Sequence, residues 1–287
     1  MERPLVTVIC LCYNHARFVE EAIQSVLSQT YTDTQLIVVD DASQDNSAEV
    51  ISALVKKNPQ IIFISQKENT GNCKAFNTAL SHARGEFVID LAADDVLMPD
   101  RIEKGVAFFL SQPDKTGVLF ADAEWIDESG KHLYLHSKRF PHNTIPAGDI
   151  YIDLIGKYFI CSPSMMFRMS VIKYLGGYDE TLAYEDFDFW IRSSREFHYG
   201  YSPEVSVKKR VVRGSMSWKQ LKSSAQQWST YQVCCEIFSL NKNSDEARAL
   251  GARIKYEIGV NLRMMNLRLV VSYLRLLLRN SKVTYNE

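Results

Sequence analysis

The 287-residue sequence contains no apolar run as long as the roughly 18 residues that a membrane-spanning helix requires. Its opening residues, MERPLVTVIC, have the pattern of a strand rather than of a signal peptide. We therefore expect a cytoplasmic chain, either soluble or in peripheral contact with the inner face of a membrane. A formal net charge of −1 makes the whole chain a poor match for polyanions, so we expect no nucleic acid partner.

The six cysteines form no CxxC pair and have no histidines at zinc-finger spacing. We therefore expect buried, reduced thiols rather than a metal cage or a disulfide framework. Glycine-rich phosphate loops are also missing, because the sequence contains no GxxxxGKS/T motif and no GxGxxG after its first apolar run. Their absence argues against P-loop and dinucleotide-binding chemistry.

Short apolar runs alternate with helical patterns over the first hundred residues. The apolar runs predict strands at 4–13, 34–42, 61–65 and 87–93, and the helical patterns predict helices at 16–30, 43–57 and 72–83. This alternation predicts an α/β fold with a mostly parallel sheet that is covered on both faces. In such sheets, ligands bind at the carboxyl ends of the strands.

Two pairs of aspartates stand where predicted strands end. Asp40 and Asp41 end the second apolar run, and Asp94 and Asp95 end the fourth. Either pair alone is explained by the capping of a helix N-terminus. Two pairs at one edge of a sheet repel each other, and a divalent cation or a ligand would relieve that repulsion. The pattern favours a nucleotide diphosphate that binds with Mn²⁺ or Mg²⁺.

Four short motifs occur in the order YN, DDAS, ADD and EDFDFW. In this order, over about residues 4–218, the chain resembles the family 2 glycosyltransferases, which are inverting enzymes with a GT-A fold, and is similar to the spore-coat polysaccharide (SpsA-type) transferases. The resemblance implies a catalytic domain over 1–217, with a Rossmann-like nucleotide-binding half over about 1–115 and an acceptor-binding half over 116–217. Residues 218–287 would form a helical C-terminal extension.

The resemblance also implies roles for residues of the nucleotide-binding half. Tyr13 would stack on the base, and Asp41 would accept a hydrogen bond from the uracil N3–H. Asp94 would lie near the ribose or the donor sugar, and Asp95 would bind the metal ion. Lys74 matches a position that often contacts the nucleotide, although a solvated helix face explains it equally well.

Inverting transfer is one in-line displacement, so it needs a general base beside the acceptor hydroxyl and stabilisation of the departing diphosphate. By resemblance, Asp186 is that base. Glu185 and Asp188 would orient the base or bind the acceptor, and either of them is an alternative base. Trp190 is assigned to the acceptor site. An acid-rich helix N-terminus without catalytic function is the competing explanation.

A departure from the family pattern occurs in KKRVVRGSMSW at 208–218. Many members have a histidine that completes the metal shell or contacts the diphosphate, and this chain has Val212 there. Arg210 and Arg213 are the nearest cations, and Arg213 is our candidate for the diphosphate. An arginine cannot ligate a metal, so the third metal ligand stays open.

From about residue 218 the pattern predicts two long helices, separated at NKNSDE. In the second, Arg268, Ser272, Arg275 and Arg279 share one helical stripe, and leucine, methionine and valine occupy most of the rest. Three explanations stay open. The helix docks on its own domain, forms a homodimer, or lies on an anionic membrane surface.

The sequence therefore predicts a metal-dependent, inverting glycosyltransferase. Its donor would be a nucleotide diphosphate sugar, with UDP-sugar preferred, and its acceptor a polysaccharide or a lipid-linked glycan of the cell envelope or surface. A sugar nucleotidyltransferase and a catalytically silent nucleotide-binding module are the alternatives.

Overall fold

The computed structural model describes residues 3–140, 145–212 and 224–285. Nine strands within these ranges form one sheet: β1 (Val6–Cys12), β2 (Thr34–Asp40), β3 (Ile62–Ser65), β4 (Phe87–Ala92), β5 (Val96–Leu97), β6 (Thr116–Ile126), β7 (His132–Leu135), β8 (Met166–Arg168) and β9 (His198–Arg210). They lie side by side in the order β3-β2-β1-β4-β8-β6-β9-β5, and β7 pairs with β6.

The strand directions divide this sheet into two parts. β3, β2, β1 and β4 are parallel to one another, as the alternation of strands and helices predicts. β6 and β9 form a second parallel pair, and β8 joins the two parts by running antiparallel to both β4 and β6. The expected α/β fold with a mostly parallel sheet is confirmed.

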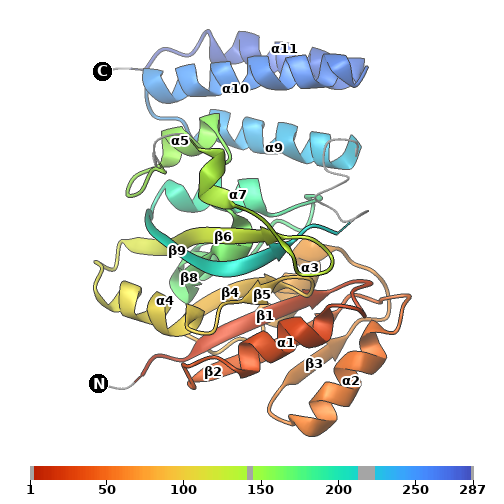
Figure 1. Cartoon of the computed structure of the whole chain (residues 1–287). Coiled ribbons are helices and arrows are strands. Elements are labelled where there is room, and N and C mark those ends of the chain that lie inside the picture. Colours follow the sequence, from red (N-terminus) through yellow and green to blue (C-terminus); the bar gives the residue numbers. More distant parts are fainter. Residues whose placement is uncertain (1–2, 141–144, 213–223, 286–287) are drawn as a thin grey trace.

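Helices cover both faces of the sheet (Figure 1). The helices of the described ranges are α1 (Val19–Leu27), α2 (Ser47–Lys57), α3 (Asn72–Leu80), α4 (Arg101–Leu110), α5 (Tyr151–Gly156), α6 (Met169–Leu175), α7 (Asp186–Ser194), α9 (Ser224–Leu240), α10 (Ser244–Arg263) and α11 (Leu267–Asn280), with short 3-10 turns at His136–Arg139 and Ser162–Ser164. The expected strands and helices of the first hundred residues are confirmed, with ends displaced by a few residues.

Alternate residues of the central strands enter two hydrophobic clusters, one on each face of the sheet. In β1, Val8 and Cys10 pack with α1, α2 and α4. Ile9 and Leu11 pack with α3, α5, α6 and α7. Because successive side chains of a strand point to opposite faces, a strand that is covered on both faces needs a continuous apolar run.

Within the described residues 224–285 the structure has three helices, where the sequence pattern predicted two long ones. The break at NKNSDE separates α9 from α10, and a second break separates α10 from α11 at 264–266. There, Met265 adopts a positive φ of 56°, and the Asn266 side chain caps α11 by accepting from the Leu269 N–H. A residue with positive φ cannot continue a right-handed helix.

The C-terminal helices dock on their own chain, stacked above α5 and α7 in Figure 1. Val233, Leu250 and Tyr273 belong to the same hydrophobic cluster as Ile9 and Leu11. The expected domain boundary near residue 217 lies outside the described residues. Over the part of the chain that is described, no helix has both the length and the hydropathy to cross a bilayer.

Candidate active site

The carboxyl ends of β1, β2 and β4 meet at one edge of the sheet. Cys12 pairs with Asp40 across β1 and β2, and Leu11 pairs with Ala92 across β1 and β4. The residues that follow these strands therefore lie next to one another. Tyr13 follows β1 with 40% of its surface exposed, so its ring has an open face for stacking.

The loops after β1 and β2 are tied to each other. Asn14 has a positive φ of 58°, a conformation that asparagine tolerates better than most residues. Its N–H donates to Ser43 Oγ at 2.8 Å, and its Oδ1 accepts from the Gln44 N–H at 2.7 Å. These bonds restrict the backbone on which Tyr13 is mounted.

Asp41 is buried and anchors the turn before α3. Its Oδ1 accepts from the Thr70 N–H at 2.8 Å, and its Oδ2 accepts from the Gly71 N–H at 2.9 Å. An ionised carboxylate has about four acceptor positions, so these bonds fix Asp41 and leave capacity for a ligand. Lys74 lies on the exposed side of α3.

Asp94 and Asp95 are both buried beyond the end of β4. Oδ1 of Asp95 accepts from the backbone N–H of Arg210 at 2.8 Å. Burial, together with the neighbouring Asp94 carboxylate, raises the pKa of Asp95 to about 7, although the charges of Lys209 and Arg210 and the Arg210 hydrogen bond act in the opposite direction. His15, from the loop after β1, brings Nε2 to 3.8 Å from Asp94 Oδ2.

The Arg210 side chain links several segments at this edge of the sheet. Its Nε donates to the carbonyl oxygen of Asp94 at 3.0 Å, and its Nη2 pairs with Glu21 Oε2 at 2.6 Å. Its Nη1 contacts the carbonyl oxygens of Asp127 and Glu128. With these partners the guanidinium acts as a structural bridge, which argues against Arg210 as a ligand for the leaving diphosphate.

The ammonium group of Lys209 interacts electrostatically with carboxylates of two different elements. Burial lowers the pKa of its ammonium group, but the carboxylates of Asp95 and Asp186 outweigh that effect and raise the pKa above its ordinary value. The ammonium also lies 5.5 Å from the centre of the Trp125 ring. Lys209 therefore carries a stable positive charge within electrostatic range of both carboxylates.

Asp186 and Glu185 stand at the N-terminus of α7, where the helix dipole favours carboxylates. Burial raises the pKa of Asp186, whereas a hydrogen bond from Ser162 and the charge of Lys209 lower it. Burial and the Asp186 charge raise the pKa of Glu185 well above its ordinary value. The net effect raises the pKa of both groups, and Glu185, whose pKa is raised well above its ordinary value, tends to keep its proton.

Asp90 adds a further carboxyl group from inside β4. Tyr178 donates its hydroxyl to Asp90 Oδ2 at 3.1 Å. Burial, opposed by the Tyr178 hydrogen bond and assisted by the Asp186 charge, raises the pKa of Asp90 to about 7. Asp90 thus links the strand of the aspartate pair to the acids of α7.

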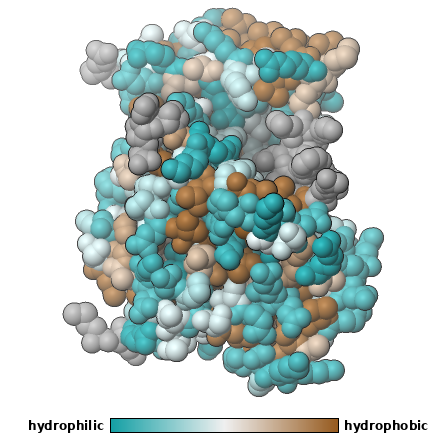
Figure 2. All heavy atoms as spheres, in the orientation of Figure 1, coloured by the Kyte–Doolittle hydropathy of each residue, from teal (hydrophilic) through white to brown (hydrophobic). Residues whose placement is uncertain are grey.

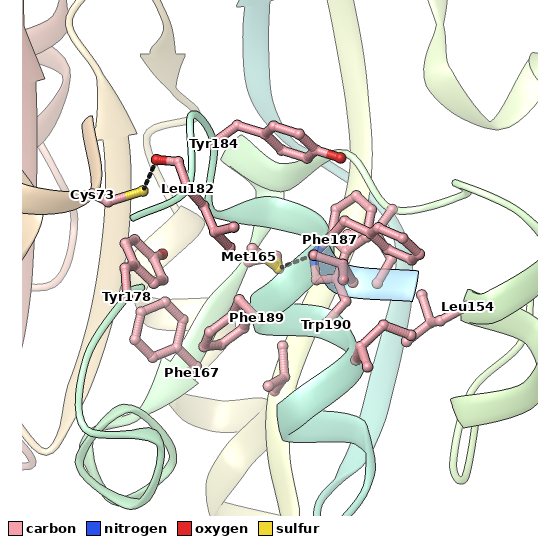
Figure 3. Packing of buried hydrophobic residues seen from close by; sticks show 14 of the residues in the cluster. Cys73, Leu154, Met165, Phe167, Tyr178, Leu182, Tyr184, Phe187, Phe189 and Trp190 are labelled. Carbon is pink, nitrogen blue, oxygen red and sulfur yellow. Dashed lines mark hydrogen bonds between the residues drawn. The ribbon is translucent and has the colours of Figure 1, made fainter. Parts of the chain in front are cut away.

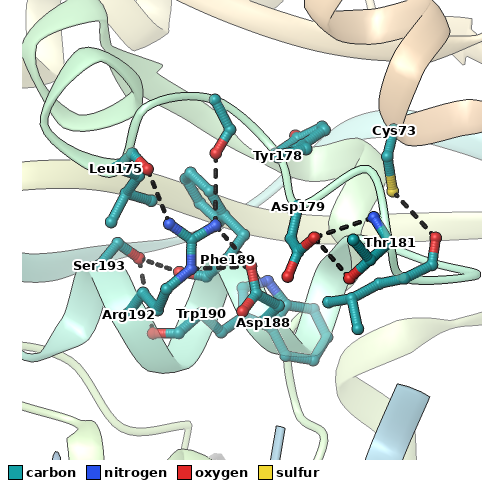
Figure 4. Close-up of polar contacts among 12 residues, drawn as sticks. Cys73, Leu175, Tyr178, Asp179, Thr181, Asp188, Phe189, Trp190, Arg192 and Ser193 are labelled. Carbon is teal, nitrogen blue, oxygen red and sulfur yellow. Dashed lines mark hydrogen bonds and ion pairs between the residues drawn. The ribbon is translucent and has the colours of Figure 1, made fainter. Parts of the chain in front are cut away.

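Asp188 has a polar environment that is centred on Arg192 (Figure 4). It forms an ion pair with Arg192, whose Nε donates to Asp188 Oδ2 at 2.8 Å. Arg192 also donates to the carbonyl oxygens of Leu175 and Gly177. The pair borders a cavity of about 420 Å³ between the segment before α7 and α9. The ion pair with Arg192 gives Asp188 a structural role within this part of the fold.

Trp190 is 4% exposed and belongs to the hydrophobic cluster (Figure 3). Its indole N–H donates to Met165 Sδ, and its ring meets Tyr158 edge-on at 5.7 Å. A side chain with so little free surface is a poor partner for a sugar. Val212 is half-buried, whereas Arg213 lies outside the described residues.

Sequence reasoning missed Lys209, Asp90 and His15. Nothing in the sequence indicates a role for Lys209, because the KKR motif does not show which residues its lysines contact in the fold. Asp90 had one, because a lone carboxylate inside the apolar run FVIDLA needs a partner. His15 follows the YN motif directly.

Comparison with known proteins defines the class. A family model described as glycosyl transferase family 2 matches residues 7–176. The chain therefore belongs to glycosyltransferase family 2, whose members transfer a sugar from a nucleotide-activated donor.

Curated relatives carry the same designation. An uncharacterized glycosyltransferase of Methanocaldococcus jannaschii is 30% identical over 74% of this chain and 72% of its own length. EpsE of Bacillus subtilis, which is described as a glycosyltransferase, is 32% identical over 72% of each chain. An uncharacterized glycosyltransferase of Rickettsia typhi is 30% identical over 72% of this chain, which spans 64% of that relative's length.

Solved structures share the fold at lower identity. The mannosyltransferase PcManGT from Pyrobaculum calidifontis, in complex with GDP-Man and Mn²⁺, is 20% identical with a TM-score of 0.67, over 100% of this chain and 77% of its own. S. aureus TarS 1-349, in complex with UDP-GlcNAc, is 18% identical with a TM-score of 0.65, over 96% of this chain and 89% of its own. The expected GT-A architecture is confirmed.

Proposed function

We propose that the chain is a metal-assisted, inverting glycosyltransferase that uses a UDP-sugar. The acceptor hydroxyl would attack the anomeric carbon as the bond from that carbon to the diphosphate oxygen breaks. The acceptor proton would pass to Asp186, and the electron pair of the broken bond would leave with the diphosphate. The single observation that carries the proposal is the placement of buried Asp94 and Asp95 at the carboxyl edge of the parallel strands, where the Arg210 N–H holds Asp95 Oδ1 at 2.8 Å.

The donor would bind at the carboxyl edge of β1, β2 and β4. The exposed ring of Tyr13 supports base stacking, and the fixed carboxylate of Asp41 supports a hydrogen bond to the N3–H of uracil. Thymine offers the same N3–H, so UDP is preferred over dTDP only by the family resemblance. Exposed Lys74 and buried Asp94 complete the proposed donor contacts, and Arg213 is kept as a candidate for the diphosphate.

A divalent cation fits the pair of Asp94 and Asp95. Mn²⁺ and Mg²⁺ are usually held by one or two carboxylates together with phosphate oxygens and water. Among the described residues, no group of three or more His, Cys, Asp or Glu side chains gathers into a metal site. Phosphate oxygens of the donor would therefore complete the shell, and the cation would neutralise charge on the leaving diphosphate. PcManGT supports this proposal because its structure contains GDP-Man and Mn²⁺.

Lys209 would connect donor and acceptor chemistry. Its charge favours the ionised form of Asp186, which a general base requires. The same charge interacts electrostatically with Asp95, close to which the leaving diphosphate would develop negative charge. Glu185 would orient Asp186 and contact the acceptor, while Asp188 and Trp190 would support the acceptor site through packing only.

The acceptor is proposed to be a polysaccharide or a lipid-linked glycan, handled on the cytoplasmic side of the membrane. Membership of family 2 favours glycosyl transfer over nucleotidyl transfer. A catalytically silent module has no observation in its favour, because the acids of both halves are present.

Calorimetric titration of UDP, dTDP, GDP and ADP, each with and without Mn²⁺, tests the donor site. We expect UDP to bind at least about tenfold more tightly with Mn²⁺ present, as one added charge-assisted contact would give. Asp95→Ala should remove the Mn²⁺ effect, whereas Asp114→Ala, at an exposed aspartate on the surface, should keep it. Absence of nucleotide binding in the unmodified chain would overturn the proposal.

A further inference from the structure

Helix α11 exposes a stripe of large apolar side chains. Leu267, Val271, Leu274 and Leu278 have 64%, 47%, 44% and 62% of their surfaces exposed. Their spacing of four, three and four residues places them on one face of the helix. A second face docks the helix through buried residues, which are Leu269, Val270, Tyr273, Leu276 and Asn280. The exposed stripe is thus additional to the apolar surface that holds α11 in the fold.

A row of arginines runs beside the exposed stripe. Arg268, Arg275 and Arg279 are all exposed, and a helical projection at 100° per residue places them about 90° from the apolar stripe. Residues 262–285 contain five lysines and arginines, and no aspartate or glutamate. This segment therefore carries only positive charges, although the formal net charge of the whole chain is −1.

The acids of the preceding helix do not balance these cations. Residues 241–285 contain nine lysines and arginines against three aspartates and glutamates. Each of the three acids has an ion-pair partner: Asp245 pairs with Arg248, Glu246 with Arg195, and Glu257 with Arg253. An anionic partner would therefore meet positive charge that is not neutralised within α10 and α11.

The apolar surface continues past the helix itself. Leu262 and Met265, at the turn between α10 and α11, are 51% and 83% exposed. Figure 2 shows apolar residues gathered over the C-terminal helices, at the end of the molecule farthest from α1 and α2. With about 21 Å of helix, this is a linear strip rather than a scatter of single side chains.

We propose that α11 lies flat on an anionic lipid bilayer. The leucine and valine stripe would enter the boundary between headgroups and acyl chains, and the arginines would extend sideways to lipid phosphates. Each cation near such a surface strengthens binding, so three arginines in one row add substantially to the apolar contribution. The inference concerns a surface remote from Asp95 and Asp186 and does not depend on the proposed reaction.

A second copy of the chain fits this surface less well. Two α11 helices that meet at their apolar stripes would bring their arginine rows into one interface. No acid between residues 262 and 285 is available to pair with them, and unpaired like charges across an interface are costly. Charge complementarity therefore selects an anionic lipid surface over self-association.

Flotation of the full chain with vesicles tests the proposal. We expect binding to vesicles of phosphatidylcholine with 30% phosphatidylglycerol, and at least about tenfold weaker binding to pure phosphatidylcholine. The double variant Arg275→Ser/Arg279→Ser should lose about tenfold in partitioning to the anionic vesicles, and 0.5 M NaCl should have a similar effect. Leu267→Ser/Leu278→Ser should also lose binding, because it removes apolar anchoring without touching the buried face.

Leu110→Ser is the matched control, since Leu110 is 66% exposed on α4 and lies outside the stripe. Its vesicle binding should equal that of the unmodified chain. Circular dichroism and UDP titration of every variant separate loss of lipid binding from loss of the fold or of the donor site. The proposal is overturned if the unmodified chain does not bind anionic vesicles, or if the stripe variants bind as well as it does. A dimer that Leu267→Ser/Leu278→Ser converts to a monomer would also overturn it, in favour of self-association.

Discussion

The backbone N–H of Arg210, at the end of β9, donates a 2.8 Å hydrogen bond to Oδ1 of Asp95, beyond the end of β4. Antiparallel pairing of β5 with β9 creates this contact, because it matches Val96 with Lys208. The residues are separated by 115 positions in the sequence. The proposed metal ligand is therefore oriented by β9, a strand distant in sequence, so a change in either segment can alter the proposed donor binding.

Arg210→Met should destabilise the protein and loosen the donor site. The substitution leaves the carbonyl oxygens of Asp94, Asp127 and Glu128 without their guanidinium donor, which costs about 2–3 kcal/mol. We expect denaturant unfolding to show this loss and UDP titration with Mn²⁺ to show weaker binding. The control is Arg17→Met: Arg17 forms an exposed ion pair with Glu128, so its loss should cost less than about 1 kcal/mol. Equal losses in the two variants would refute the bridging role of Arg210.

Lys209→Met should slow sugar transfer by about tenfold to a hundredfold, because it removes a cation from the proposed diphosphate site and from the base. The pH profile gives a specific readout. The Lys209 charge lowers the pKa of Asp186, so its removal should move the acidic limb of the rate profile to higher pH. Lys208→Met is the matched control on the same strand. A Lys209→Met profile that falls in rate without moving would indicate a purely structural role.

Asp186→Asn should reduce the transfer rate by about a hundredfold to ten-thousandfold, the usual contribution of a general base. The affinity for UDP with Mn²⁺ should change little, because Asp186 would act on the acceptor. Glu185→Gln should have a much smaller effect, since the raised pKa of Glu185 keeps it protonated and glutamine preserves a donor. The reverse order of the two effects would reassign the base to Glu185.

The fold was predictable from the sequence because its signals are local. Apolar runs such as LIVVD and FVID identify buried strands regardless of their neighbours. The break between α10 and α11 had only a weak signal, because RMMN consists mostly of good helix formers and Asn266 is its one cap-forming residue.

The site was predictable only in part, for a related reason. Asp94 and Asp95 were found because strand ends meet at one edge, which follows from topology alone. Lys209 reaches them through β9, whose position depends on pairing with a distant strand. The ion pair of Asp188 was predictable from the sequence, because Arg192 follows it at the i+4 spacing of a helical ion pair.

The coupling between Asp90 and α7 leads to a prediction for stability against pH. Burial raises the pKa of Asp90 from 3.8 to about 7. Between these values the folded protein binds a proton that the unfolded chain has released, so the free energy of unfolding falls as the pH rises through this window. The Asp90→Asn variant has no titratable group at this position, so its free energy of unfolding should not show the decrease that Asp90 contributes in this pH window.

Urea unfolding at pH 5, 6, 7 and 8 measures the effect. The stability of Asp90→Asn relative to the unmodified chain should increase from pH 5 to pH 8 by on the order of 2 kcal/mol. Tyr178→Phe should act in the opposite direction, because loss of the hydroxyl that lowers the pKa of Asp90 extends the fall to higher pH. Parallel curves for Asp90→Asn and the unmodified chain would mean that Asp90 does not titrate in this range, and that Asp95 and the acids of α7 determine the pH dependence of the site.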